Sequence, residues 1–492
     1  MRDLLLGVDV GTTTVKASIF APHGELVAEG AEPSRVERPR DGWVEQDADE
    51  IWRAAAAAIR RATAAARPGA RVVGIGVCGH SPTLILLDAA GRPVRRAIVW
   101  QDRRAAAEAA ELAERLGEHA VDLLGGRLPA GPSFPHARLL WLARHEPGAL
   151  RQAAHALDTK DWVNYRLTGV VASDPWSAKG LANMATGEPI AAWRELLGVD
   201  PSLAPPTRPA SARCGPIRPE VAAELGLERD AVVAIGWTDG GCAMLGTGCF
   251  VAQGAAYEVA GTSEVIGAVV PFKPDDPRIQ SAPGPDPRWT LLMGPTQAGG
   301  ASLQWLGRLL DAEPAGLVRL AEQSPAGANG LLFLPYLEGE RAPIWDPSAR
   351  GILFGLASGH GRADAARAVL EGVAHSVRHV LETIEEITSR RFDEVRVCGG
   401  GSREPLWNQI KADVLGRTVR CTAQAETGSL GAAMLGGVTA GVFADLGAGA
   451  AALVRFGTAY HPRRDPAERY EAAHRRYVAL YPRVRDLFDQ AS

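Results

Sequence analysis

The sequence predicts an α/β protein made of two related halves, and three observations indicate this fold class. Short apolar strands alternate with Ala-rich helical stretches along all 492 residues. A Gly-Thr turn between two strands occurs at Gly11-Thr12 and again, about 250 residues later, at Gly261-Thr262. The chain is also longer than the roughly 100–200 residues of one ordinary domain. We therefore expect a duplicated domain plan, with one domain at 1–250 and the other at 251–492.

The first half opens with strands that are separated by turns. Alternating apolar side chains predict strands over residues 4–10, 14–20 and 25–29, with turns at 11–12 and 22–24. The periodicity that follows predicts helices over 51–66, 103–118 and 136–146 and strands over 72–77 and 84–87. Residues 201–209 are expected to form a loop, because proline removes backbone donors.

The second half repeats the opening and then alternates strands with helices. The prolines between 271 and 287 predict a loop. Beyond it, the pattern predicts strands over 331–334 and 394–398 and helices over 363–388, 403–416 and 428–441.

Composition excludes several classes of protein. The net charge is −4 and Arg alternates with acidic residues, which argues against nucleic acid as a partner. No run of about 18 apolar residues occurs, so no membrane segment is expected. The six cysteines form no CxxC pair, which is typical of reduced, structural thiols and of a cytoplasmic protein.

Two familiar nucleotide-binding patterns do not apply. None of the five lysines follows a glycine, so a GxxxxGK[ST] phosphate loop is excluded. The series Gly74-x-Gly76-x-x-Gly79 matches the dinucleotide pattern, but a turn at Ser81-Pro82 and a strand follow it where that pattern needs a helix.

The two Gly-Thr turns suggest a different way to hold phosphates. Each turn offers a glycine for close backbone approach, exposed N–H groups and hydroxyl donors. The residues concerned are Gly11, Thr12, Thr13, Gly261, Thr262 and Ser263. A single Gly-Thr turn is more often structural, whereas the pair favours a clamp around ATP phosphates.

A carboxylate and a lysine accompany the first turn. Asp9 ends a predicted buried strand, where an unpaired carboxylate is costly, and a Mg²⁺ ion held through water would satisfy it. Lys16 either supports the phosphates or extends into solvent. In the second half, Gly399-Gly400-Gly401 follows a strand, and it either lies flat against a purine or forms a tight turn.

Several stretches together resemble the FGGY carbohydrate kinases, a family of the actin, hexokinase and heat-shock ATPase superfamily. The matching stretches are 7–13 (GVDVGTT), 42–47 (GWVEQD), 98–104 (IVWQDRR), 160–169 (KDWVNYRLTG), 236–241 (GWTDGG), 261–263 (GTS), 299–306 (GGASLQWL), 399–413 (GGGSREPLWNQIKAD) and 426–433 (ETGSLGAA). The resemblance spans the chain. It implies two ribonuclease-H-like domains of the actin/hexokinase type flanking a central cleft.

The resemblance also implies roles for single residues. Asp239 would take the proton from the substrate hydroxyl, with Gly240 leaving room for the substrate; the alternative for Asp239 is a helix cap. Asp9 would position Mg²⁺. The residues implied to contact ATP are Thr12, Thr13, Thr262, Gly300, Gly400 and Gly401.

The acceptor implied is a small sugar or polyol, and a pentulose such as D-xylulose is the leading choice. Candidate substrate residues are His80, Ser81, Trp100, Asp102, Asp239 and Gly240, with Trp43 and Gln101 as further pocket candidates. His80 is equally well interpreted as a structural hydrogen-bonding group. Trp43 and Trp100 could instead pack in the core. Xylulokinases usually carry Met-His-Gly where this chain has Gly79-His80-Ser81, and Asn where it has Gly240.

Other interpretations stay open. They are an FGGY kinase for another ketose, polyol or sugar acid, a catalytically silent sugar sensor, and a protein-binding ATPase of the heat-shock type. Retention of Asp239 argues against the sensor, and the lack of a peptide-binding domain after residue 460 argues against the ATPase. Many family members are dimers, so a homodimer is an open expectation.

Overall fold

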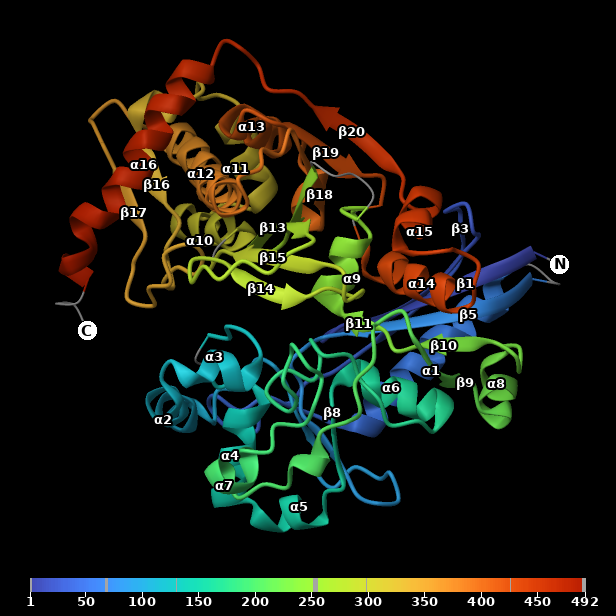
Figure 1. Cartoon of the computed structure of the whole chain (residues 1–492). Helices are drawn as coiled ribbons and strands as arrows, with labels where there is room; N and C mark the ends of the chain where they lie inside the picture. Colours follow the sequence, from blue (N-terminus) through green and yellow to red (C-terminus); the bar gives the residue numbers. More distant parts are fainter. Residues whose placement is uncertain are drawn as a thin grey trace. The chain divides into compact units, whose positions relative to one another are not determined.

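The computed structural model describes residues 2–66, 70–129, 131–250, 255–297, 299–424 and 426–488. Its contacts divide the chain into two compact units (Figure 1). The first unit comprises Met1–Val251, Ala282–Thr290 and Thr427–Val454, and the second comprises Ala252–Ser281, Leu291–Glu426 and Arg455–Ser492. The domain limits 1–250 and 251–492, and the cleft expected between the domains, stay predictions.

The first unit is built on a mixed sheet in the order β3-β2-β1-β5-β10-β9, with β11 also paired to β5. The strands are β1 (Arg2–Val10), β2 (Thr14–Phe20), β3 (Leu26–Pro33), β5 (Ala70–Gly79), β9 (Arg213–Pro216), β10 (Val232–Ala234) and β11 (Trp237–Thr238). Strands β1, β2 and β3 form an antiparallel meander, and β1 pairs in parallel with β5. Strand β5 pairs in parallel with β11, so the carboxyl ends of β1, β5 and β11 meet at one edge.

The second unit carries a sheet in the order β14-β15-β13-β12-β18-β19-β20. Its strands are β12 (Ala255–Ala260), β13 (Glu264–Val270), β14 (Gln280–Pro283), β15 (Thr290–Pro295), β18 (Glu394–Cys398), β19 (Thr418–Thr422) and β20 (Phe456–Tyr460). The hairpin β12–β13 corresponds to β1–β2, and β12 pairs in parallel with β18 as β1 does with β5. The two units therefore repeat one domain plan.

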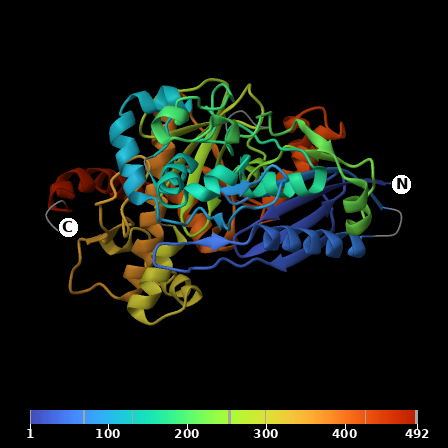
Figure 2. The ribbon, with the colours of Figure 1, turned by 90° about the horizontal axis from the view of Figure 1, so that it is seen from below.

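Helices cover these sheets and fill the connections between strands. Those of the first unit include α1 (Ala48–Ala65), α2 (Ala106–Leu116), α4 (Pro135–His145), α6 (Thr159–Thr168), α9 (Asp239–Leu245) and α14 (Gly428–Thr439). Those of the second include α10 (Gly300–Leu310), α12 (Arg362–Thr388), α13 (Pro405–Leu415) and α16 (Ala467–Phe488). Helix α1 starts at the cap Asp47 and runs along the blue strands in Figure 2, where Ile51 and Ile59 join the core.

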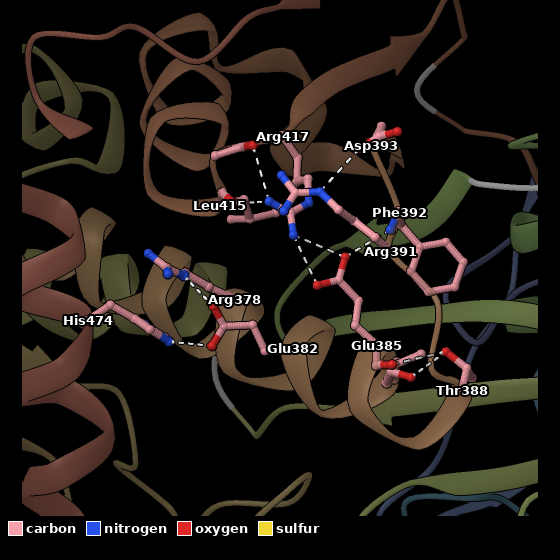
Figure 3. A network of polar contacts seen from close by, with 12 residues as sticks. Arg378, Glu382, Glu385, Thr388, Arg391, Phe392, Asp393, Leu415, Arg417 and His474 are labelled. Carbon is pink, nitrogen blue, oxygen red and sulfur yellow. Dashed lines mark hydrogen bonds and ion pairs between the residues drawn. The ribbon is translucent and has the colours of Figure 1, made fainter. Parts of the chain in front are cut away.

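Charged groups tie the end of α12 to its neighbours in the second unit (Figure 3). The Arg417 guanidinium donates to both Glu385 oxygens at 3.1 and 3.0 Å. One Glu382 oxygen accepts from Arg378 Nε at 2.7 Å, and the other lies 3.0 Å from His474 Nε2 on α16. The Arg417–Glu385 pair is largely buried, whereas Glu382 is 41% exposed.

Helix α14 packs unusually close to the first sheet, beside β1 and β5 in Figure 1. A Cβ added at Gly7 would lie 1.8 Å from Ser429 O, and one added at Gly76 would lie 1.8 Å from Ala432 O. Glycine is therefore required on both strands, because any side chain would collide with the helix backbone. Gly74 and Gly76 of the apparent dinucleotide pattern are thus packing residues of β5.

Most predicted elements are confirmed within a few residues. The strands at 4–10, 14–20 and 394–398 and the helices at 51–66 and 363–388 all occur. The prediction of a loop throughout 271–287 is wrong, because β14 lies inside it. Strand β14 has only four residues and ends in proline, so its sequence carries little strand signal. No helix of the described residues is long and apolar enough to cross a bilayer.

The close approach of α14 predicts a large penalty for the smallest possible side chain. Gly76→Ala should lower the free energy of unfolding by about 3 kcal/mol, because the methyl group overlaps a backbone carbonyl that cannot rotate away. Thermal or urea unfolding measures the loss. Gly359→Ala is the matched control, since a Cβ there meets nothing within 4 Å; equal stability of the two variants would contradict the packing argument.

Candidate active site

The edge where β1, β5 and β11 end gathers the predicted site residues of the first unit. Asp9 lies near the end of β1 and pairs in register with Cys78 of β5. His80 follows β5 directly, and its N–H donates to Val10 O at 3.0 Å. Asp239 follows β11 and is the first residue of α9. Parallel pairing thus brings together residues that are up to 230 positions apart.

Asp239 is not needed as the helix cap. Thr238 caps α9, because its hydroxyl accepts from Gly241 N–H at 3.2 Å. The Asp239 carboxylate accepts from Gly240 N–H at 2.7 Å through Oδ1. A Cβ at Gly240 would meet nothing within 4 Å, so there is open space beside this carboxylate.

The electrostatics of this edge favour a proton acceptor near neutral pH. Burial and the Asp9 charge raise the pKa of Asp239 to about 7, while the Gly240 N–H and Lys179 oppose the rise. The pKa of Asp9 is also raised, by burial, and Cys78 and Lys16 limit the shift. Two carboxylates with raised pKa values at one edge of a sheet are typical of a catalytic or metal-binding site.

The first Gly-Thr turn connects to a tryptophan from a distant part of the chain. Gly11 N–H donates to Thr14 O at 3.1 Å, which closes the turn between β1 and β2. Trp100 Nε1 donates to Thr12 Oγ1 at 3.2 Å, and the Trp100 side chain is 41% exposed. An exposed indole beside the turn presents an aromatic face to a ligand. Thr13 is exposed and Lys16 is partly buried on β2.

His80 is buried and uncharged. Its Nδ1 lies 2.9 Å from Thr83 Oγ1 and 3.3 Å from Thr159 Oγ1, and burial lowers its pKa to about 4. Within the described residues, the buried Nε2 has no hydrogen-bond partner. A buried polar atom without a partner is costly, so it marks a position where a ligand or a water would bind.

Ser81 lies in a chain of polar contacts that sequence reasoning missed. Its hydroxyl donates to Asp158 Oδ2 at 2.5 Å and accepts from Lys179 Nζ at 2.8 Å. Asp158 caps α6, and Oδ1 accepts from Thr83 N–H at 3.0 Å. The rarity of lysine is the sequence signal that could have pointed to Lys179. Lysine occurs five times in the chain, and three of these side chains are buried.

The structure gives Asp102 and Trp43 local structural partners. Asp102 is buried, forms a two-point ion pair with Arg104 at 2.9 and 2.7 Å, and accepts from Val44 N–H at 2.5 Å. The Arg104 guanidinium stacks over the Trp43 ring at 3.7 Å. These side chains hold the loop that carries Trp100. Gln101 accepts from Arg38 at 3.3 Å on the surface.

The predicted nucleotide residues of the second unit surround the β12–β13 turn. Gly261 N–H donates to Ser263 O at 3.1 Å, and Gly300 N–H donates to Gly261 O at 2.9 Å, which joins the turn to the start of α10. Gly399 and Gly401 pack on Ala260, where a Cβ would lie 2.4 Å from its O and 2.8 Å from its Cβ, respectively. Gly400 faces open space. The three glycines therefore combine packing with an exposed backbone surface.

Comparison with known proteins agrees with this arrangement. The N-terminal domain model of the FGGY family of carbohydrate kinases matches residues 4–246, and its C-terminal domain model matches 256–440. The chain belongs to this FGGY family. It is therefore an ATP-using phosphotransferase that acts on an alcohol group of a sugar-like substrate, with the two-domain α/β fold of the family.

The FGGY relatives differ in acceptor. The xylulose kinase of Escherichia coli is 33% identical over 447 residues, covering 89% of this chain and 90% of the relative. The glycerol kinase of a Polaromonas species is also 33% identical, over 464 residues, and the match covers 89% of this chain and 91% of the relative. The crystal structure of a xylulose kinase from Rhodospirillum rubrum has a TM-score of 0.90 at 31% identity. The match covers 99% of this chain and 100% of the other.

This FGGY kinase also has a buried ion cluster beneath its second Gly-Thr turn. Lys411 of α13 contacts Glu258 of β12, and its Nζ lies 3.5 Å from Glu264 Oε1 on β13. Burial raises the pKa of Glu264 to about 8, with Lys411 opposing the shift and Glu258 adding to it. A Cβ at Gly299 would lie 2.7 Å from the Glu264 carboxylate. The cluster thus supports the turn and the start of α10.

Removal of the lysine should destabilise the second unit in a pH-dependent way. Lys411→Met leaves two buried carboxylates without a cation, which costs about 3–5 kcal/mol. Because the folded state then holds protons that the unfolded state releases above about pH 4.3, its stability falls as pH rises. The melting temperature of the variant should therefore drop further below wild type at pH 8 than at pH 5. Adding Glu264→Gln should recover part of the loss; an equal deficit at both pH values would contradict this account.

Proposed function

We propose that this FGGY kinase transfers the γ-phosphate of ATP to a hydroxyl group of a pentulose such as D-xylulose, with Asp239 as the general base. The observation that carries the proposal is the Asp239 carboxylate, whose pKa is raised to about 7 next to the open space at Gly240. A base with a pKa near the working pH combines the correct protonation state with sufficient basicity.

The proposed transfer is a direct displacement. A substrate oxygen attacks the γ-phosphorus, its proton passes to Asp239, and the bond between the γ-phosphorus and the bridging oxygen of ADP breaks. Asp239 lies after β11, and the short α9 starts at this residue, so its position is set by the sheet rather than by a mobile loop. The similarity to xylulose and glycerol kinases supports the same chemistry in this chain.

The acceptor is proposed to bind among residues that follow β5. His80, Ser81 and Trp100 offer a neutral imidazole, a hydroxyl and an aromatic face, which is the combination that reads sugar hydroxyls. We assign Asp102 to positioning the Trp100 loop, because Arg104 and Val44 already occupy its oxygens. Glycerol or another polyol is the second candidate, since the glycerol kinase relative is as similar as the xylulose kinase.

ATP is proposed to be held by the two Gly-Thr turns and by the glycines near α10 and β18. The phosphate contacts are Gly11, Thr12, Thr13, Lys16, Gly261, Thr262 and Ser263, and the base and ribose contacts are Gly300, Gly400 and Gly401. Within the described part of the chain no group of three or more acidic, His or Cys side chains forms a metal cage. Mg²⁺ bound through water to Asp9 and directly to ATP phosphates fits this, because Mg²⁺ often uses few protein ligands.

A screen of acceptors tests the proposed function. Purified enzyme is assayed with Mg-ATP and a panel of ketoses, polyols and aldonates, with ADP release coupled to a spectroscopic signal. D-Xylulose should give the highest kcat/KM. Phosphorylation of glycerol or an aldonate in preference would move the assignment to another FGGY acceptor, and no turnover above background ATP hydrolysis would favour a silent sensor.

Replacement of the base should remove chemistry and spare ATP binding. Asp239→Asn keeps the shape of the side chain and loses the proton-accepting oxygen, so kcat should fall by about 10²–10⁴. The Kd for ATP, measured by calorimetry, should change little. Asp88→Asn, in the surface turn after β6 (Ile85–Leu87), is the control and should keep wild-type kcat.

The pH profile provides a second readout of the same role. A base with a pKa of about 7 must be deprotonated to act, so wild-type kcat/KM for the acceptor should fall as pH drops through 7. An acidic limb that begins only below pH 5, or near-normal turnover of Asp239→Asn, would remove Asp239 from the role.

Asp9 should govern the response to metal. Asp9→Ala removes the carboxylate that we propose to hold the hydration shell of Mg²⁺, so the Mg²⁺ concentration for half-maximal rate should rise about 10-fold. The titration is run at fixed ATP, and binding of the acceptor in the absence of Mg²⁺ is measured separately and should be unaffected. An unchanged metal response would contradict the assignment.

A further inference from the structure

Lys179 is a charged group that the proposed function has not used. It belongs to the connection between α6 and β9, and its side chain is 3% exposed. Its Nζ donates to Ser81 Oγ at 2.8 Å and to Trp176 O at 3.1 Å, and the ammonium lies over the Trp176 ring at 4.8 Å. Burying a lysine is costly, so the contacts that offset this cost indicate its role.

The Ser81 hydroxyl has a defined hydrogen-bond direction. A hydroxyl has one proton and two lone pairs. Its proton goes to Asp158 Oδ2 at 2.5 Å, and one lone pair accepts from Lys179. One lone pair is left, so Ser81 can only accept a further hydrogen bond. Ser81 is partly exposed, whereas Asp158 and Lys179 are buried. Of these three hydrogen-bonded residues, Ser81 is therefore the one that a ligand can reach.

We propose that Lys179 is a positioning residue that determines specificity: by holding one lone pair of Ser81 while Asp158 takes the proton, it orients the hydroxyl so that the remaining lone pair accepts from one hydroxyl group of the phosphoryl acceptor. This inference rests on the proposed function, because it assigns Ser81 to the substrate. It adds to the proposed function that a substrate hydroxyl donates its hydrogen bond to Ser81, and that Lys179 helps to hold Ser81 in place for this contact.

The charges around Asp158 are consistent with this role. Burial and Asp161 raise its pKa, and Lys179, Ser81 and the Thr159 N–H counter the rise, which leaves it at about 6. At neutral pH the carboxylate is therefore ionised and accepts the Ser81 proton. Burial and, to a smaller extent, Lys160 lower the pKa of Lys179, and the charges of Asp158, Asp174 and Asp239 oppose this shift.

A double-mutant cycle on the full-length enzyme tests the inference. The variants are Lys179→Met, Ser81→Ala and the double variant, assayed with the acceptor that wild type uses best. Lys179→Met should raise the KM for the acceptor about 10-fold, as expected when the Ser81 hydroxyl is no longer held toward the substrate and one hydrogen bond is lost. The KM for Mg-ATP should stay within about twofold. The double variant should be about as impaired as Ser81→Ala alone, because Lys179 acts through Ser81.

The opposite outcomes are equally defined. Additive effects in the cycle, or a parallel rise of both KM values, would mean that Lys179 only anchors the loop at Trp176, and the inference would be overturned. If Lys179→Met does not fold, Lys179→Gln replaces it, since an amide still donates to Ser81 without the charge. Lys179→Gln should keep most acceptor affinity, and a loss as large as that of Ser81→Ala would overturn the inference.

Substrate analogues give an independent readout of direction. Fluorine in place of a hydroxyl cannot donate a hydrogen bond. At the position that faces Ser81, the deoxyfluoro analogue should therefore lose as much affinity as the deoxy analogue, about 10-fold. Full activity of every deoxyfluoro analogue would refute the assignment. A wild-type enzyme that phosphorylates no acceptor refutes the proposed function together with the inference, whereas an active wild type with an additive cycle refutes the inference alone.

Discussion

The close contact between α14 and the first sheet is the constraint on which the candidate site depends. The helix backbone touches β1 at Gly7 and β5 at Gly76, and it also touches α9, where a Cβ at Gly431 would lie 2.0 Å from Cys242 O. Its first residue, Gly428, adjoins the Asp9 carboxylate, which a Cβ there would approach to 2.3 Å. One helix therefore sets the spacing of the strand that carries Asp9 and the helix that begins with Asp239.

Two buried lysine clusters give the units a similar electrostatic design. In the first unit, Lys160 pairs with Asp161 and Asp174, next to the hydrogen-bonded group of Ser81 and Asp158. In the second, Lys411 pairs with Glu258 and Glu264 beneath the Gly261 turn. Most surface ion pairs among the described residues use Arg, for example Arg60–Glu224 and Arg194–Asp200, whereas the cation of both buried clusters is the compact ammonium of a lysine. Each cluster lies next to a turn or loop that we propose to bind a ligand.

Local patterns in the sequence were sufficient to predict the strands, the two Gly-Thr turns and the Asp9 carboxylate at a strand end. Asp239 was singled out because residues 236–241 resemble a family segment, and no local strand pattern pointed to it. The pair Ser81 and Lys179 was not found, because 98 residues separate them and neither has a distinctive neighbourhood. Asp102 was predicted as a substrate contact because its two oxygens are chemically suitable; their occupation by Arg104 depends on a side-chain conformation that no local pattern encodes.

Residues 427–454 belong to the first unit although about 175 residues separate them from its largest segment, Met1–Val251. During translation at roughly 5–20 residues per second, the first sheet would emerge and wait on the order of 10–40 s before α14 is synthesised. For that interval its glycine-lined face has no partner and stays exposed to solvent. A chain that ends between residues 240 and 427 therefore contains both carboxylates without the helix that supports them.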